Sequence, residues 1–420
     1  MAIVLDPTNG ITNVNGTAAL PAITGTDTDT GLYFGTNTLG LSANGSTVAT
    51  ISTTGLSVTG SITTGGVVGS PYAMKNRIIN GAMMIDQRNN GSSVTNTVAT
   101  AAGVYTLDRW AYWASQASKF TIQQNAASVT PPVGYKNYLG ITSSSAYTVG
   151  SSEYFIITQT IEGLNVADLA WGTANAKTVT LSFQVYSSLT GTFGGVVQNS
   201  AGNRSYPFSY TISSANTWTQ ISVTIAGDTT GTWLTTNGIG MYVIFGLGVG
   251  STFSNTAGAW AAGNYNSVPG ATSVVGTNGA TFYITGVQLE VGSSATSFEW
   301  RPYGMELALC QRYYWSTNAA SNFNSFFRAN GIGYSTTQVG FVVQLPVPMR
   351  ASPSSLSYSG TIKTSDTVNV TSITSLVINQ ANFDSPLLFA TVASGITQFR
   401  PYILFAGGDT TSSVGISAEL

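Results

Sequence analysis

Most of the chain alternates apolar and polar residues with a period of two, which is the pattern of half-buried β-strands. The clearest runs lie at residues 179–185, 221–225 and 239–245, where aliphatic and aromatic side chains occupy every second position. Turn-rich stretches separate these runs, and no long helical period lies between them. Strands connected in this way predict an antiparallel β-sandwich rather than alternating β–α units.

The alternation changes phase once within a single run, at residues 281–291. Phe282 and Ile284 are the apolar positions before Gly286, and Val287 and Leu289 are the apolar positions after it. A phase change at a glycine is typical of a β-bulge, because the extra residue shifts all later side chains to the other face. We therefore expect one long strand with a bulge at Gly286.

A short helical period follows this run. Met305, Leu309 and Tyr313 recur at intervals of four residues, which predicts a connecting helix within residues 304–316. The strand pattern then returns in four further runs, at residues 339–345, 373–378, 387–392 and 399–405. These runs predict a second, smaller β-sandwich over residues 317–420.

The first 74 residues have shorter alternations, such as Leu39 with Leu41 and Leu56 with Val58, separated by Gly, Asn, Thr and Ser. Strands this short cannot bury their apolar faces within one chain. They predict a shaft in which three copies of the chain intertwine. A flexible linker rich in Gly, Ser and Thr is the alternative interpretation.

Charged residues are scarce. They make up 7% of the 420 residues, with a formal net charge of −2, whereas a soluble domain usually contains about 25%. Without a basic surface, a nucleic acid is not an expected partner. The 43% of hydrophobic residues excludes disorder driven by charge repulsion.

The sequence contains no histidine and a single cysteine, Cys310. This excludes Ser–His–Asp and Cys–His catalytic groups, imidazole zinc sites and a disulfide within the chain. We expect Cys310 to be a small buried residue. The acids between residues 150 and 230 lack the spacing of paired catalytic carboxylates. The sequence therefore predicts no catalytic residue, no metal site and no cofactor.

The better candidate site is an uncharged segment at residues 246–279, rich in Gly, Ser and Asn. It carries Trp260, Asn264 and Tyr265. An aromatic ring can stack on the C–H face of a sugar while amides and hydroxyls bind its rim, so these three residues are the predicted ligand-binding site. Packing of Trp260 in the core is the alternative. Four other tryptophans are scattered along the chain and are expected in the core: Trp113, Trp171, Trp218 and Trp233.

Several charged residues have a structural interpretation instead. In a chain with so few charges, Asp108 beside Arg109 is expected to form a clasp between strands, because a buried charge needs a partner. Glu290, Glu299 and Arg301 are interpreted in the same way.

Some segments resemble bacteriophage tail fibres. One tail-fibre domain is similar to the jelly rolls of carbohydrate-binding modules. Its start resembles NRIINGAMMIDQR (76–88) and YTLDRW (105–110) of this chain. Its end resembles ITGVQLEVG (284–292), FE (298–299) and GMELALCQRYY (304–314). VPMRASP (347–353) and SAEL (417–420) resemble the ends of small trimeric jelly rolls that cap fibres. GLYF (31–34) and GLSVTG (55–60) resemble trimeric shafts.

The expected organisation is all-β. A virion-attachment and intertwined trimeric shaft segment (1–74) precedes a carbohydrate-binding-like jelly roll (75–303), a helical connector (304–316) and a small carboxy-terminal jelly-roll sandwich (317–420).

The resemblance implies a homotrimer in the virion, assembled in the host cytoplasm and attached through its amino terminus to the phage tail or an adaptor protein. It would recognise a bacterial surface glycan or an outer-membrane component without cleaving it. The alternatives are a fibre or spacer attached to the capsid or collar, and a depolymerase tailspike. The resemblance assigns no catalytic residue and no glycan contact.

Overall fold

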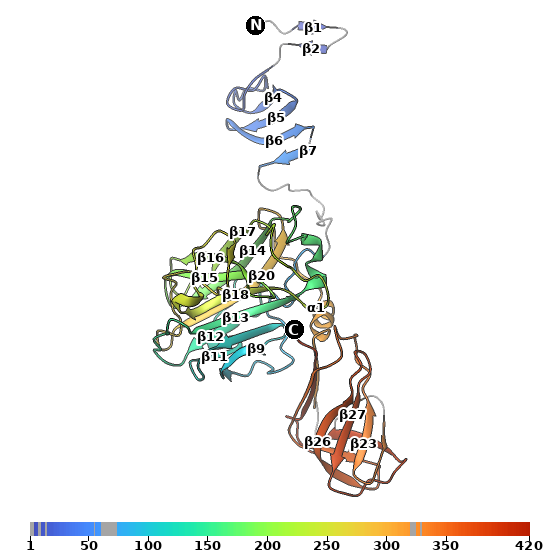
Figure 1. Ribbon diagram of the computed structural model, residues 1–420. Coiled ribbons are helices and arrows are strands. Elements are labelled where there is room, and N and C mark those ends of the chain that lie inside the picture. Colours follow the sequence, from blue (N-terminus) through green and yellow to red (C-terminus); the bar gives the residue numbers. More distant parts are fainter. Residues whose placement is uncertain are drawn as a thin grey trace. The chain divides into compact units, whose positions relative to one another are not determined.

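A computed structural model describes residues 4–6, 10–12, 15–53, 55–59, 74–319, 325–327 and 330–420. Within these residues the chain consists of antiparallel sheets and one short α-helix, which confirms the predicted all-β class (Figure 1). The chain divides into two compact units, Met1–Ala73 and Met74–Leu420. No helix in the described part is long and apolar enough to cross a membrane.

The amino-terminal unit contains two small antiparallel sheets whose strands pair in sequence order. Their strands are β1 (Val4–Asp6), β2 (Gly10–Thr12), β3 (Ile23–Thr24), β4 (Gly31–Gly35), β5 (Thr38–Ala43), β6 (Ser46–Ser52) and β7 (Gly55–Val58). Several apolar side chains remain exposed, including Ile51 and Leu56, the latter with 61% of its surface accessible. Intertwining with two further copies, which would cover such side chains, stays a prediction.

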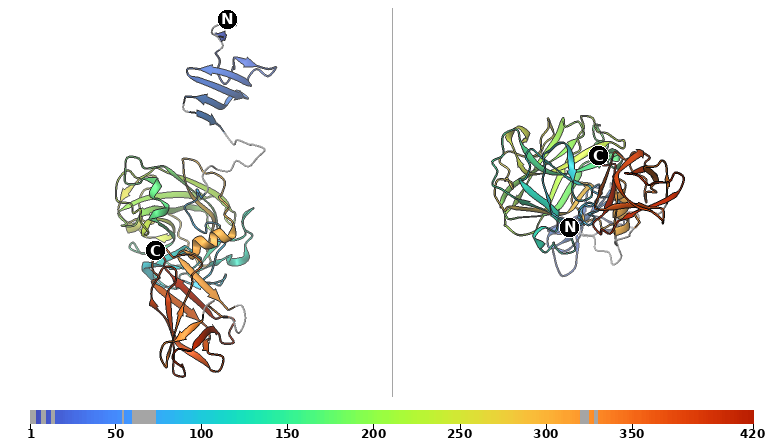
Figure 2. Two further views of the ribbon diagram at one scale, coloured as in Figure 1. Left: turned by 90° about the vertical axis from the view of Figure 1, so that its right-hand side faces the viewer. Right: turned by 90° about the horizontal axis from the view of Figure 1, so that it is seen from below.

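The second unit begins with a sandwich of a seven-stranded sheet (order β19-β16-β15-β18-β13-β10-β9) and a six-stranded sheet (β17-β14-β20-β12-β11-β8), seen from further sides in Figure 2. Its strands are β8 (Val94–Thr95), β9 (Ala99–Tyr105), β10 (Trp110–Ala114), β11 (Phe120–Gln124), β12 (Leu139–Ser143), β13 (Tyr154–Glu162), β14 (Val179–Ser187), β15 (Gly191–Asn199), β16 (Arg204–Ile212), β17 (Thr219–Ile225), β18 (Ile239–Val249), β19 (Ala261–Ala262) and β20 (Thr281–Val291). Short 3-10 turns are η1 (Ala126–Ser128), η2 (Gly163–Asn165), η3 (Ala167–Leu169) and η4 (Ser251–Phe253). The alternating side chains of both sheets enclose one large apolar core.

The predicted bulge in β20 is confirmed. Its pairing with β14 shifts register between Ser182 and Gln184, which face Gln288 and Thr285. Gly286 has a φ of 61°, and a Cβ added there would come within 2.5 Å of the Tyr135 hydroxyl. Glycine is required because it adopts this left-handed conformation without cost and leaves room for that hydroxyl.

A helix is confirmed within the predicted connector, as α1 (Tyr303–Gln311), but it ends before Tyr313 and its buried residues are Glu306 and Cys310. The remaining strands are β21 (Tyr314–Asn318), β22 (Gly331–Gly333), β23 (Gln338–Val342), β24 (Ser355–Ser359), β25 (Ile362–Ser365), β26 (Val370–Gln380), β27 (Leu387–Val392), β28 (Pro401–Ala406) and β29 (Ser413–Ser417). Six of them close into a barrel in the order β22-β23-β27-β26-β25-β28, and β21-β29-β24 form a separate sheet. For residues 317–420 the alternation alone predicts a sandwich of two open layers. In the structure β22 pairs with β28 instead and closes the barrel. A closed barrel leaves no exposed strand edges.

Cys310 lies on the buried side of α1, against Ile79, Ile85 and Tyr313. This confirms the expectation of a buried residue. Burial raises the pKa of the Cys310 thiol well above its usual value, so the thiol stays protonated and unreactive.

Candidate functional site

The outer face of the seven-stranded sheet carries aromatic and amide side chains. Trp113 on β10 faces Ile156 on β13, and Gln198 on β15 faces Tyr242 on β18. Because alternate residues of a strand point to the same face, Tyr154 shares the side of Ile156. Together with neighbouring aliphatic residues these rings form a small apolar layer outside the main core.

This layer forms one side of a groove of about 220 Å³. The residues around it are Trp113, Tyr154, Gln198, Ser200, Ala201, Gly202, Tyr242, Asn264 and Asn266. The rings of Trp113 and Tyr242 meet edge to face, with centroids 5.4 Å apart. None of the lining residues carries a charge, so the groove combines apolar ring surface with neutral hydrogen-bonding groups.

The polar edge of the groove is fixed by Gln198. Its Nε2 donates to Ser205 Oγ and to Asn264 Oδ1, both at 3.0 Å, and to the Tyr265 carbonyl at 3.2 Å. These contacts tie the segment that follows β19 to strands β15 and β16. The amide edge is therefore held in place before any ligand arrives, which lowers the entropic cost of binding.

Some buried polar atoms on this side of the sheet have no hydrogen-bond partner among the described residues. They are Trp113 Nε1, Thr158 Oγ1 and Asn266 Oδ1. Asn266 has only 2% of its surface exposed. Leaving such a group unsatisfied costs about 1–3 kcal/mol, so its presence calls for an explanation beyond folding.

The structure places two of the three predicted site residues at this groove. Asn264 lines it, and Tyr265 packs against the apolar layer beneath it. Trp260 points elsewhere. Its ring lies edge to face with those of Trp171 and Trp233, with centroids 5.3 and 5.4 Å away.

The indole N–H of Trp260 is also occupied, because it donates to the Ala226 carbonyl at 2.7 Å. The contacts of Trp260 are thus those of a packing residue at the margin of the core. Sequence reasoning missed Tyr154, Gln198 and Tyr242, and it assigned Trp113 to the core. No local signal marks these residues, because they come from four different strands.

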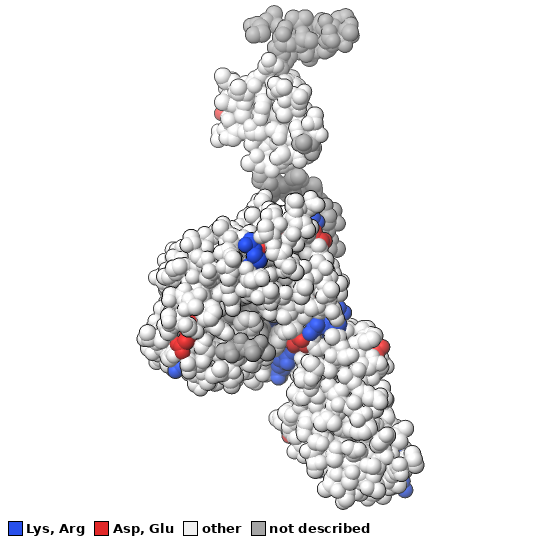
Figure 3. All heavy atoms as spheres, in the orientation of Figure 1, with Lys and Arg blue, Asp and Glu red and all other residues white. Residues whose placement is uncertain are grey.

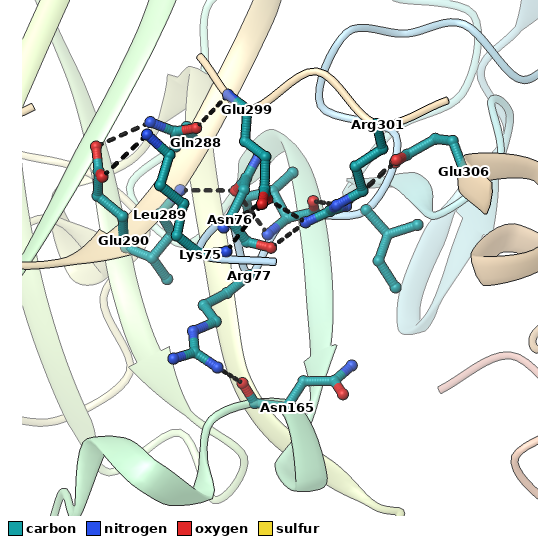
Figure 4. A network of polar contacts seen from close by, with 12 residues as sticks. Lys75, Asn76, Arg77, Asn165, Gln288, Leu289, Glu290, Glu299, Arg301 and Glu306 are labelled. Atoms are coloured by element: carbon teal, nitrogen blue, oxygen red, sulfur yellow. Dashed lines mark hydrogen bonds and ion pairs between the residues drawn. The ribbon is translucent and has the colours of Figure 1, made fainter. Parts of the chain in front are cut away.

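The segments that resemble tail fibres meet in polar networks rather than at the groove. In the first, the Glu299 carboxylate accepts the backbone N–H groups of Lys75 and Asn76 at 3.1 and 3.0 Å. Arg301 pairs with Glu299 and Glu306 at 3.2 and 3.3 Å. Figure 4 shows these residues converging, and the network joins the beginning of the sandwich to its end.

The second network joins the sandwich to the carboxy-terminal region, where Figure 3 shows charged side chains gathered on an otherwise largely uncharged face. Arg109, 1% exposed, pairs with Glu419 and donates to the Thr160 carbonyl. Arg312 pairs with the buried Glu162 at 2.6 Å. Arg109 is therefore paired, as predicted for a buried charge, but its partner is Glu419 and not the neighbouring Asp108.

Asp108 belongs to the same network. Burial raises the pKa of Asp108 to about 7, although its carboxyl oxygens accept the backbone N–H and the side-chain Nε2 of Gln87. Between about pH 4 and 7 the folded chain then keeps a proton that the unfolded chain releases, so the free energy of unfolding falls as the pH rises. We expect this contribution to reach about 1 kcal/mol per pH unit.

Urea unfolding at a series of pH values tests this expectation, with Asp108→Asn as the variant. The asparagine cannot titrate, so the variant should lose most of the decline between pH 4 and 7. Equal pH dependence in the two proteins would show that Asp108 is ionised throughout this range.

No protein-family model and no curated protein sequence matches the chain. Solved structures similar to it include the enzymatically active domain of tailspike protein 4 from bacteriophage CBA120, at 12% identity and a TM-score of 0.26, covering 52% of this chain and 22% of that one. A CBM4 structure matches at 16% identity and a TM-score of 0.28, covering 51% and 98%. The family 11 carbohydrate-binding module from Clostridium thermocellum, in complex with a mixed-linked tetrasaccharide, matches at 10% identity and a TM-score of 0.23, covering 48% and 96%.

Proposed function

We propose that this chain is a homotrimeric bacteriophage tail fibre that binds a neutral glycan on the bacterial surface. The groove on the seven-stranded sheet carries the proposal. It sets the rings of Trp113 and Tyr242 beside the amides of Gln198 and Asn264, with no charge among its lining residues. Aromatic rings pack on the C–H face of a sugar while amides bind its hydroxyls, and a neutral sugar needs no charged partner.

The size of the groove limits what one chain can hold. Its volume of about 220 Å³ lies below the roughly 300–1,000 Å³ of sites that enclose a drug-sized ligand. One or two sugar units would therefore occupy each groove, with modest affinity. Three chains in one fibre, and several fibres on one particle, would raise the overall avidity by engaging many sites at once.

Binding without cleavage is part of the proposal. A glycosidase needs two carboxyl groups about 5–9.5 Å apart on either side of the scissile bond, and none of the residues that line the groove is an acid. A depolymerase tailspike is the second candidate. It would be supported if incubation with host capsule or lipopolysaccharide released reducing ends.

The virion location and the trimer rest on the resemblance of the shaft and motif segments and on the exposed apolar side chains of β6 and β7, such as Ile51 and Leu56. The amino-terminal 74 residues would attach the fibre to a tail or adaptor protein. Attachment to the capsid or collar is the alternative. A monomer mass in light scattering of the purified chain would contradict the trimer.

The adsorption test uses Tyr242→Ala, which removes one wall of the groove. We expect the variant to bind host cells at least about tenfold more weakly, because a stacked ring contributes about 0.5–1.5 kcal/mol beyond area burial at every site. Binding of the purified chain to cells measures the effect.

Tyr358→Ala, which removes an exposed ring from β24 of the carboxy-terminal region, is the matched control. Unfolding curves of both variants are needed as a check that each of them still folds. If Tyr242→Ala binds as wild type and Tyr358→Ala does not, the receptor surface lies on the carboxy-terminal region.

A further inference from the structure

Three connections between strands meet at one end of the closed barrel. They are residues 334–337 after β22, residues 366–369 after β25 and residues 393–400 after β27. The Ile396 N–H donates to the Thr336 carbonyl at 3.1 Å, and Arg400 pairs with Asp366 at 2.9 Å. Because these contacts join the three connections into one surface, we name it the barrel tip.

The barrel tip holds large apolar side chains out in the solvent. Phe399 has 80% of its surface accessible, Val368 has 76% and Tyr334 has 64%. Side chains this accessible protrude from the protein. Burial of apolar surface is what stabilises a fold, so these three side chains contribute little to the stability of the barrel.

The backbone that carries two of these side chains is strained. Phe399 has a φ of 67°, and Thr367, directly before Val368, has a φ of 76°. This left-handed region costs free energy for a bulky or β-branched residue. The Phe399 N–H donates to the Gly333 carbonyl while the Gly333 N–H donates to the Arg400 carbonyl. This is the arrangement of a bulge whose left-handed position usually holds glycine, so folding alone does not explain the phenylalanine.

The backbone N–H groups beside the exposed side chains are already bonded within the chain. Those of Val368 and Asn369 donate to Asp366 Oδ1 at 3.1 and 2.7 Å. That of Phe399 donates to the Gly333 carbonyl at 2.8 Å. A sugar or a peptide is recognised through donors and acceptors that the protein leaves free, whereas hydrocarbon requires backbone groups that are satisfied internally. The barrel tip meets the second requirement.

The charge of the barrel tip is balanced. Its charged side chains are Asp366 and Arg400, which pair with each other. No net charge therefore has to lose its water when the tip enters an apolar medium. Tyr334 adds a ring with a hydroxyl, a side chain that is enriched where a membrane meets water.

We propose that the barrel tip inserts Phe399 and Val368 into the surface of a lipid membrane. These side chains enter the boundary between head groups and acyl chains, where they lose contact with water. Tyr334 and the long side chain of Arg400 stay at the level of the head groups. The tip uses no residue of the groove, so this proposal goes beyond glycan binding and does not depend on it.

Sedimentation of the full-length chain with phosphatidylcholine vesicles tests the proposal. The test variant is Phe399→Gly, which removes the ring and adopts the left-handed backbone without cost. We expect it to bind the vesicles about tenfold more weakly than wild type, because a large apolar side chain no longer leaves water. It should unfold near the wild-type temperature, since the ring is exposed.

Phe383→Ala is the matched control. It removes a half-exposed phenylalanine from the connection between β26 and β27, at the opposite end of the barrel, and should bind vesicles as wild type does. Tyr242→Ala, which alters the groove, should also bind them as wild type does, so failure of glycan binding is distinguished from failure of this proposal. Added salt should change vesicle binding little, because the tip carries no net charge.

Wild-type protein that does not sediment with the vesicles would overturn the proposal. Equal binding by Phe399→Gly would do the same, as would binding that high salt abolishes. If Phe399→Gly weakens adsorption to cells while wild type ignores vesicles, the tip contacts a protein or a glycan and the lipid proposal fails. Val368→Ser, with a loss expected in the same direction, serves as the second variant should Phe399→Gly fail to fold.

Discussion

Replacing Glu419 with alanine is expected to lower the free energy of unfolding of the unit Met74–Leu420 by about 3–5 kcal/mol. Glu419 pairs with Arg109, whose side chain is 1% exposed, and with Arg88 at 3.0 Å. Burial lowers the pKa of Arg109, and the charge of Glu419 is the largest of several contributions that together raise this pKa above its usual value. Removing that carboxylate leaves a buried guanidinium charge without a counter-charge. Removing one partner of a buried ion pair destabilises a protein far more than replacing both partners by apolar residues.

Chemical denaturation of the full chain measures this effect. Asp168→Asn provides the control, because Asp168 pairs with Arg77 at 2.7 Å with 48% of its side chain exposed. An exposed pair of this kind is worth about 0–1 kcal/mol. A loss below about 1 kcal/mol for Glu419→Ala would show that the junction tolerates an unpaired Arg109 through local opening or water entry.

Trp260→Ala is expected to destabilise the sandwich by about 2–4 kcal/mol, somewhat less than the removal of a fully buried tryptophan. Its ring contacts Trp171, Trp233 and Tyr206, and its N–H bond to the Ala226 carbonyl would also be lost. The cavity and the unpaired carbonyl both lower stability.

Thermal unfolding of Trp260→Ala beside Asn264→Ala checks this expectation. Asn264 lines the groove and lies outside the aromatic cluster, so its variant should unfold near the wild-type temperature. An unchanged melting temperature for Trp260→Ala, together with lost adsorption, would favour the stacking role that the loop sequence predicts.

The sequence by itself determined the features that depend on neighbouring residues. Period-two alternation placed the strands, and the phase change at Gly286 located a bulge, because the side chains of a strand alternate whatever its partners are. A spacing of four residues located a helix but placed its end too late, since α1 ends at Gln311. The scarcity of charge indicated that Arg109, Glu299 and Arg301 would be paired, because an unpaired buried charge is too costly to keep.

Only the tertiary structure decided where these elements meet. Alternation is the same in an open sandwich and a closed barrel, so the pairing of β22 with β28, whose residues are far apart in sequence, could not be read from it. The groove has the same origin, since the order β15-β18-β13-β10 brings Gln198, Tyr242, Tyr154 and Trp113 to one face. The loop sequence identified Asn264 and Tyr265, but the direction of a side chain depends on the space left by residues distant in the chain. The space around Trp260 is set by Trp171 and Trp233, whose rings pack against the ring of Trp260.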